Sequence, residues 1–129
     1  MKYVSHSVRR AARVSMMAMA VGAAIACATP AFAHVFPKHQ EPGAGMSVAE
    51  PKEVRIQFDG PLEPAFSTLT VTDAGGKDVE SAKAAVDPAH TDTISVALPS
   101  LQAGKYTVHW AAVAADGHRT HGDYTFEVK

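Results

Sequence analysis

Histidine is the residue type in this chain best suited to metal or acid–base chemistry. Six of the seven histidines lie beyond residue 33, at His34, His39, His90, His109, His118 and His121. The sequence has no Gly-rich phosphate loop, no nucleophile-elbow serine and no CxxC pair. Because Cys27 is the only cysteine, residues 34–129 contain no thiolate. Metal chemistry would therefore depend on imidazoles and carboxylates.

The triplet Asp116-Gly117-His118 places a carboxylate and an imidazole two positions apart. In an extended segment, residues i and i+2 face the same way, so the two side chains would lie side by side. Gly117 adds no side chain between them and permits unusual backbone angles. The alternative is an ordinary Asp-Gly turn with a solvent-facing histidine, because such turns are common in β proteins.

Residues 1–33 have the three parts of a secretory signal peptide. A basic start precedes an apolar run of small residues over 16–27, and Ala31-Phe32-Ala33 provides the small-x-small pattern that signal peptidase reads. We therefore expect cleavage after Ala33. A membrane anchor is disfavoured because the apolar run is shorter than the roughly 20 residues that a spanning helix needs. Lipidation at Cys27 ranks lower still, because the usual leucine of a lipobox is missing.

Cleavage after Ala33 would make His34 the first residue of the mature chain. Its α-amine and the near imidazole nitrogen can then close a six-membered chelate ring on one metal ion. An α-amine has a pKa of about 7.7–8.0, so protons compete only weakly with a metal near neutrality. The alternative is an incidental first residue on a frayed terminus.

The charges are unevenly distributed along the chain. The 12 Lys and Arg and 13 Asp and Glu give a formal charge of −1, but residues 1–33 hold four basic residues and no carboxylate. Residues 34–129 therefore carry 8 basic and 13 acidic side chains, a formal charge of −5. This balance argues against a nucleic-acid binder, whose affinity depends on basic surface. The length is typical of one domain.

Five stretches alternate apolar and polar residues with period two, which predicts strands with one buried face. They cover 53–58, 68–72, 93–98, 105–110 and 123–128, and Gly, Pro and Asp cluster between them. We expect an all-β fold, a small antiparallel Greek-key sandwich or barrel. Residues 79–86 predict an additional edge strand or a helical turn, residues 38–51 a loop, and Trp110 a core position beside Val108.

Three segments together resemble the CopC family of periplasmic copper-binding proteins. They are a histidine directly after an Ala-x-Ala cleavage site, Leu-Gln-Ala-Gly-Lys-Tyr-Thr-Val-His-Trp at 101–110, and Ala-Asp-Gly-His at 115–118 before a Gly-x-Tyr-x-Phe-x-Val ending. The resemblance implies a cupredoxin-like (Ig-like) sandwich and a non-enzymatic periplasmic protein of copper homeostasis and resistance. It assigns the ligands of one Cu(II) per mature chain to His34, Asp116 and His118. It also implies a CopD-like inner-membrane copper transport protein as partner.

The donor set suits that metal, because nitrogen donors with one carboxylate favour Cu(II), although zinc and nickel accept similar donors. Two departures from the family pattern stand out. Some members have a Met-rich Cu(I) loop, whereas only Met46 lies beyond residue 33. Some members also have a Glu near the Cu(II) site, and here only Asp59 or Glu63 could replace it.

The other histidines have weaker expected roles. His39 and His121 are candidates for secondary metal contacts, whereas His90 and His109 are expected to be solvated surface residues. Two other functions remain open at this stage. One is a copper-dependent oxidative enzyme with an N-terminal histidine brace, and the other is an Ig-like interaction domain without specific metal binding.

Overall fold

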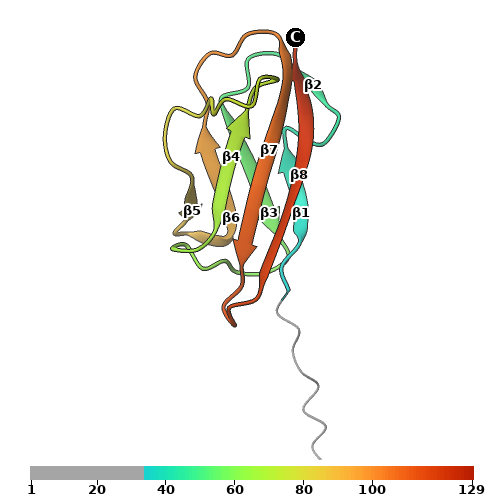
Figure 1. Ribbon diagram of the computed structural model, residues 1–129. Coiled ribbons are helices and arrows are strands. Elements are labelled where there is room, and N and C mark those ends of the chain that lie inside the picture. The colour runs from blue at the N-terminus through green and yellow to red at the C-terminus, as the bar shows by residue number, and fades with distance from the viewer. Residues whose placement is uncertain (1–33) are drawn as a thin grey trace, which may run out of the picture. The chain divides into compact units, whose positions relative to one another are not determined.

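The computed structural model describes residues 34–129, and the expected signal peptide lies outside these residues. This part of the chain folds as two four-stranded β-sheets and contains no helix (Figure 1). The strands are β1 (Pro37–Glu41), β2 (Ser47–Val48), β3 (Glu53–Phe58), β4 (Thr68–Thr72), β5 (Ala85–Asp87), β6 (His90–Ala97), β7 (Gly104–Val113) and β8 (Arg119–Val128). The all-β prediction is confirmed.

The two sheets have the strand orders β1-β3-β6-β5 and β2-β8-β7-β4. Neighbouring strands are antiparallel except for β2, which pairs in parallel with the end of β8. The longest ladder joins β7 to β8, from Gly104 opposite Val128 to Val113 opposite Arg119. Because the hairpin extends to Val113 and Arg119, it carries the intervening loop to one end of the sandwich.

Two short strands lie where the sequence predicted only a loop. Residues 38–51 contain most of β1 and all of β2, so the loop prediction is wrong at these positions. No apolar alternation marks β1, because it is a polar edge strand whose register with β3 shifts between Pro37 and His39. The predicted edge strand in 79–86 is confirmed in part as β5, and no helical turn forms there.

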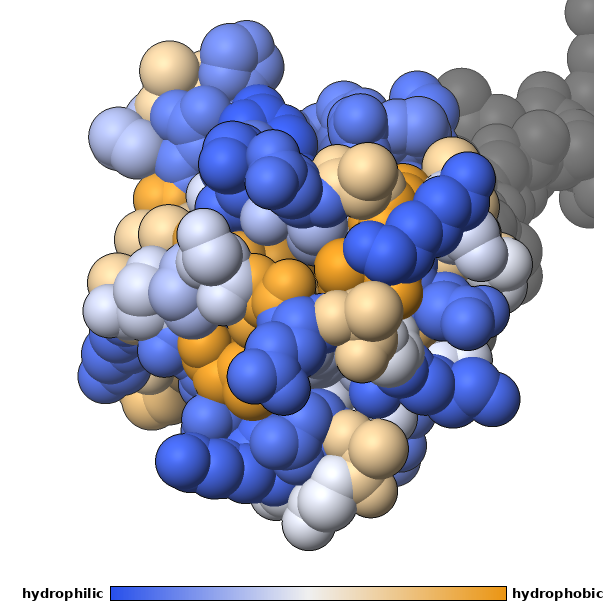
Figure 2. Space-filling model, turned by 90° about the horizontal axis from the view of Figure 1, so that it is seen from above, coloured by the Kyte–Doolittle hydropathy of each residue, from blue (hydrophilic) through white to orange (hydrophobic). Residues whose placement is uncertain are grey.

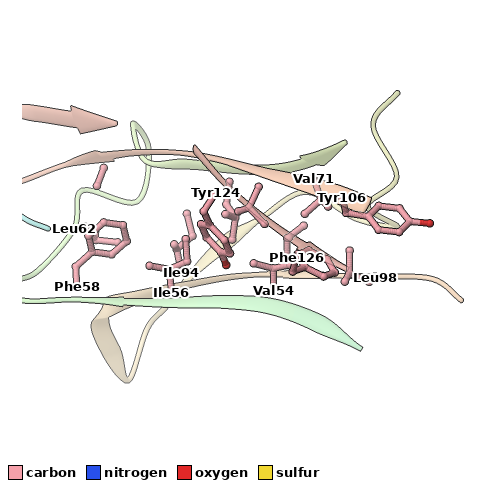
Figure 3. Packing of buried hydrophobic residues seen from close by; sticks show 14 of the residues in the cluster. Val54, Ile56, Phe58, Leu62, Val71, Ile94, Leu98, Tyr106, Tyr124 and Phe126 are labelled. Atoms are coloured by element: carbon pink, nitrogen blue, oxygen red, sulfur yellow. The ribbon is translucent and has the colours of Figure 1, made fainter. Parts of the chain in front are cut away.

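The core lies between the sheets and is built from the inward-facing residues of the predicted strands (Figure 3). Its largest fully buried side chains are Phe58 and Phe126. The Tyr106 hydroxyl donates to Gln102 O at 2.7 Å, whereas the buried Tyr124 hydroxyl has no hydrogen-bond partner within residues 34–129. Burial therefore raises the pKa of Tyr124.

Trp110 is confirmed as a residue that packs against the core, although it is only half-buried. Its indole contacts the Phe58 ring edge-on, with centroids 5.3 Å apart. It also covers Gly122, the residue opposite it in β8, where a Cβ would lie 2.8 Å from the indole. A glycine at position 122 is therefore what allows this strand pair to accommodate the large ring.

The two ends of the sandwich carry different parts of the chain (Figure 1). The start of the described chain and the β7–β8 loop lie at one end, and the C-terminus lies at the other (Figure 1). Seen from the C-terminal end, the surface is mostly hydrophilic, with hydrophobic residues visible among the polar ones (Figure 2). Residues 34–129 contain no helix long and apolar enough to span a membrane.

Candidate metal site

The loop between β7 and β8 is a tight turn rather than an extended segment. Gly117 N donates to Ala114 O at 2.9 Å, and Ala114 N donates to His118 O at 2.9 Å. Gly117 has φ +86°, a left-handed conformation that residues with a Cβ rarely adopt. The alternative of an Asp-Gly turn is therefore the one that the structure adopts.

The turn nevertheless brings Asp116 and His118 into direct contact. One carboxylate oxygen, Asp116 Oδ1, accepts a hydrogen bond from the His118 backbone N at 3.0 Å. The other, Oδ2, lies 2.5 Å from the ring nitrogen Nδ1 of His118. These hydrogen bonds, with smaller contributions from the charges of His118 and His34, hold the pKa of Asp116 below its ordinary value. The carboxylate is therefore ionised and suited to a cation.

The segment that leads to β1 is anchored immediately after His34. Val35 is buried, at 3% exposure, and a Cβ on Gly60 would lie 3.0 Å from its side chain. Phe36 N donates to Asp59 Oδ1 at 2.9 Å, and Asp59 N donates back to Phe36 O at 3.0 Å. His34 itself stays exposed, so its side chain projects from a fixed base.

This anchoring places His34 beside the hairpin loop, 84 positions away in the sequence. The imidazole centroids of His34 and His118 are 5.0 Å apart, with an angle of 69° between the ring planes. His34, Asp116 and His118 are thus brought to one end of the sandwich. Across residues 34–129, however, no three His, Cys, Asp or Glu side chains converge as a ready-made metal site.

That result has a structural reason. Both carboxylate oxygens of Asp116 already bind His118, so its carboxylate is oriented toward the His118 ring and backbone rather than toward a shared metal position. The α-amine of His34 does not exist in the full chain, where that nitrogen is an amide. The donors therefore fit a metal by type and proximity, and they require a local rearrangement to bind it.

A shallow cleft of about 250 Å³ adjoins His34, lined by Asp59 and by residues such as Pro61 and Ala115. A larger cleft of about 380 Å³ lies at the other end of β1, beside Glu41 and Met46, away from these donors. Of the two residues considered as acidic support for the site, Asp59 contacts the segment carrying His34. No hydrogen bond or ion pair within residues 34–129 involves the Glu63 side chain.

The two candidate secondary contacts lie on exposed strand positions. His39 is in β1, with its Nε2 4.0 Å from Glu41 Oε2. His121 is in β8 opposite Ala111, and its side chain has no hydrogen bond or ion pair within residues 34–129. Neither joins the cluster of His34, Asp116 and His118, and their metal roles remain predictions.

His90 is exposed as expected, although its Nδ1 lies 3.3 Å from Asp87 Oδ2, and His109 is held by partners on two neighbouring strands. His109 Nδ1 lies 2.8 Å from Asp123 Oδ1, its direct neighbour across the β7–β8 ladder. Its other ring nitrogen, Nε2, lies 3.0 Å from Thr72 Oγ1 in β4. The sequence pattern could not show this network, because it depends on the register of three strands.

Comparison with known proteins places the chain among copper-handling relatives. A family model described as CopC domain matches residues 38–129. The chain is 35% identical over 100 residues to Protein YobA of Escherichia coli, covering 76% of this chain and 81% of that protein. It is also 35% identical over 115 residues to an Escherichia coli protein named Copper resistance protein C, covering 84% of this chain and 91% of that protein.

A third relative is much longer. The chain is 29% identical over 99 residues to Copper transport protein CutJ of Bacillus subtilis, covering 75% of this chain and only 18% of that protein. In CutJ, a segment similar to this chain is therefore a small part of a protein named for copper transport.

Two crystal structures show the same architecture. CopC from Methylosinus trichosporium OB3b has a TM-score of 0.69 and 33% identity, covering 74% of this chain and 94% of the other. PcoC, described as a methionine-rich copper resistance protein from Escherichia coli, has a TM-score of 0.68 and 32% identity, covering 75% of this chain and 100% of the other. The family model matches most of this chain, residues 38–129, and the chain shares its fold with these two structures. The chain therefore belongs to the CopC family.

Proposed function

We propose that the mature chain is a periplasmic protein that holds one Cu(II) ion at its N-terminus, in copper homeostasis and resistance. The proposed ligands are the α-amine and imidazole of His34, the carboxylate of Asp116 and the imidazole of His118. The observation that carries the proposal is the 5.0 Å approach of the His34 and His118 rings, with Asp116 in contact with His118. Family membership supports a role in handling copper.

The chemistry of these donors favours the oxidised ion. Imidazole, amine and carboxylate donors suit Cu(II), which also binds most tightly in the divalent series. Cu(I) prefers soft thioether and thiolate donors, and Met46 is the only sulfur-containing residue in 34–129. The protein in this respect differs from PcoC, which is described as methionine-rich. We therefore expect no comparably tight Cu(I) site.

We further propose that the protein passes copper to a membrane transport protein of the CopD type and performs no catalysis. The relation to CutJ supports this step, because a segment like this chain is there part of a larger copper transport protein. Delivery by an exposed site is also reasonable chemically, since His34 and the hairpin loop lie at the surface.

The decisive experiment compares two forms of residues 34–129, one starting at His34 and one with a single extra N-terminal residue. The extra residue converts the α-amine to an amide, which lacks a lone pair for the metal unless it is deprotonated. The extended form should fold normally, because the strands begin at Pro37, yet bind Cu(II) far more weakly. A His at the third mature position could rescue binding, but that position is Phe36.

Equilibrium Cu(II) titration, with zinc and nickel as competitors, and electron paramagnetic resonance would be used on both forms. Matching affinities and matching nitrogen hyperfine patterns would exclude His34 as an N-terminal chelate. Copper-dependent oxidation of chitin or cellulose would instead favour the oxidative enzyme, and an absence of specific copper binding would favour an interaction domain.

A further inference from the structure

Thr120 makes the hydrogen bond that joins the two parts of the proposed site. Its Oγ1 donates to Val35 O at 2.6 Å. Val35 directly follows His34, and Thr120 lies two residues beyond His118. Within residues 34–129, no other side-chain hydrogen bond connects Val35 or Phe36 to the β7–β8 hairpin. Thr120 therefore links the strand that follows Asp116 and His118 to the segment that carries His34.

The bond fixes one end of a peptide group that is also fixed at its other end. The group between Val35 and Phe36 is planar, with the Val35 oxygen on one side and the Phe36 N–H on the other. Thr120 binds the oxygen, and Asp59 accepts from the N–H at 2.9 Å. With both ends held, this peptide plane cannot rotate freely.

Burial next to the plane adds a further constraint. Val35 is 3% exposed, and its side chain packs close to Gly60. A β-branched side chain has few rotamers, so a buried valine also fixes its own Cα. Thr120 itself is half-buried, which shields its hydrogen bond from water and strengthens it. His34 lies one position before the peptide group that these contacts hold in place.

We propose that Thr120 is a positioning residue for Cu(II) binding, acting through the clamped Val35–Phe36 peptide to hold His34 beside His118. This inference rests on the proposed Cu(II) site. Ordering the terminus before the metal arrives reduces the conformational entropy that binding would otherwise cost. Thr120 touches no proposed ligand by a hydrogen bond, so its effect on the metal passes through the backbone of the N-terminal segment.

The test uses the mature chain and four single variants. Thr120→Val removes the hydroxyl at nearly constant shape and should weaken Cu(II) binding roughly tenfold. Thr120→Ser keeps the donor and should restore affinity close to wild type. Thr120→Ala also removes the donor and gives the same readout if the valine variant does not fold. Thr125→Val is the matched control, because Thr125 is an exposed residue of β8 whose side chain makes no hydrogen bond within residues 34–129.

A double-mutant cycle with His34→Ala separates positioning from a general structural effect. If Thr120 acts through His34, Thr120→Val should cause little further loss of Cu(II) affinity once His34 is removed. It should also change the electron paramagnetic resonance spectrum of the wild-type background and leave that of the His34→Ala background unchanged. An equal loss in both backgrounds, or a loss of stability with unchanged affinity, would overturn the inference.

The cycle also separates this inference from the proposed function. If the wild-type mature chain binds Cu(II) tightly and His34→Ala weakens it, the proposed function stands whatever Thr120→Val does. If the wild type binds no Cu(II) specifically, both the proposed function and the role of Thr120 fall.

Discussion

Two of the three His–Asp pairs within residues 34–129 differ in which imidazole atoms they leave available to a metal. In the hairpin loop, Asp116 contacts His118 Nδ1, and His118 Nε2 has no hydrogen bond within residues 34–129. On the outer face of the β4–β7–β8 sheet, Asp123 contacts His109 Nδ1 while Thr72 contacts Nε2. Of these two pairs, only the loop pair presents an open nitrogen. A His–Asp pair thus favours metal binding when the second nitrogen is open and another donor lies close.

The surroundings of the two pairs explain this difference. Asp123 and His109 sit opposite each other in a regular ladder, so neighbouring strands supply partners for both imidazole nitrogens. Asp116 and His118 sit in a turn at the end of the sheet, where no strand covers them and His34 approaches from the other sheet's edge. In the ladder, both nitrogens of His109 bind neighbouring strands, whereas in the turn Nε2 of His118 is available to a ligand.

The largest expected effect on Cu(II) affinity comes from replacing the histidine of the loop pair, His118, and is compared with replacing the histidine of the sheet pair, His109. His118→Ala should weaken Cu(II) binding by more than about 100-fold, because it deletes a proposed ligand and the partner of Asp116. His109→Ala should change the affinity by less than about twofold, because both nitrogens of His109 are engaged elsewhere. Competition titration with a calibrated chelator measures both. Similar losses in the two variants would mean that the metal binds to surface histidines nonspecifically.

The next effect tests whether the turn itself sets the loop pair apart. Gly117 has φ +86° with open space around it, so Gly117→Ala adds backbone strain without a clash. The expected cost is about 1 kcal/mol of unfolding free energy, with roughly tenfold weaker Cu(II) binding as Asp116 and His118 move. Gly45→Ala is the matched control, because Gly45 has φ +73° with equally open space in the β1–β2 connection.

The glycine control should lose similar stability in urea denaturation while retaining full Cu(II) affinity. An unchanged affinity in Gly117→Ala despite the stability loss would show that the left-handed turn is not needed to present the ligands.

The sequence predicted the loop pair better than the sheet pair, for reasons of distance along the chain. Asp116 and His118 are two residues apart, so their contact was expected from spacing, although in an extended segment rather than in the tight turn that forms. His109 and Asp123 meet only through strand register, and the sequence pattern assigned His109 to a solvated face. The approach of His34 to His118 spans 84 positions, and before the structure it rested on family resemblance alone.

The same distinction applies to the fold. The strands with buried faces were predicted because alternating apolar residues indicate which face of a strand packs against the core, as Val54 and Ile56 do in β3. The edge strands β1 and β2 were missed because polar or very short strands show no alternation of apolar residues. The hydrogen bond from Thr120 to Val35 could not be predicted for another reason. Threonine is common in strands, and the acceptor is a backbone oxygen, which no residue type marks in the sequence.

The dependence of unfolding free energy on acid pH tests how much ionised Asp116 stabilises the metal-free protein. The pKa of Asp116 is lowered below 3.8, mainly by hydrogen bonds from His118. A carboxyl whose pKa is lower in the folded state contributes stability above its unfolded pKa and loses that contribution as pH falls through the folded value. Stability should therefore fall below about pH 4, and Asp116→Asn should reduce this acid dependence.

Carbon-detected NMR titration of the Asp116 carboxyl gives the direct measurement, with the His118→Ala variant as reference. The midpoint should lie below 3.8 in the wild type and rise in the variant, because the hydrogen bond and charge of the imidazole are gone. Identical midpoints would mean that the imidazole does not stabilise the carboxylate.

The smallest expected effect concerns the sheet pair, whose role we expect to be cohesion alone. The side chains of His109 and Asp123 are 42% and 65% exposed, so water screens their attraction. A double-mutant cycle of His109→Ala and Asp123→Ala should give a coupling of about 0.5 kcal/mol in unfolding free energy. Urea denaturation of the metal-free protein measures it, and added Cu(II) should leave the coupling unchanged. A coupling that vanishes when Cu(II) is added would show that the sheet pair also binds the metal, and would remove the contrast between the two pairs.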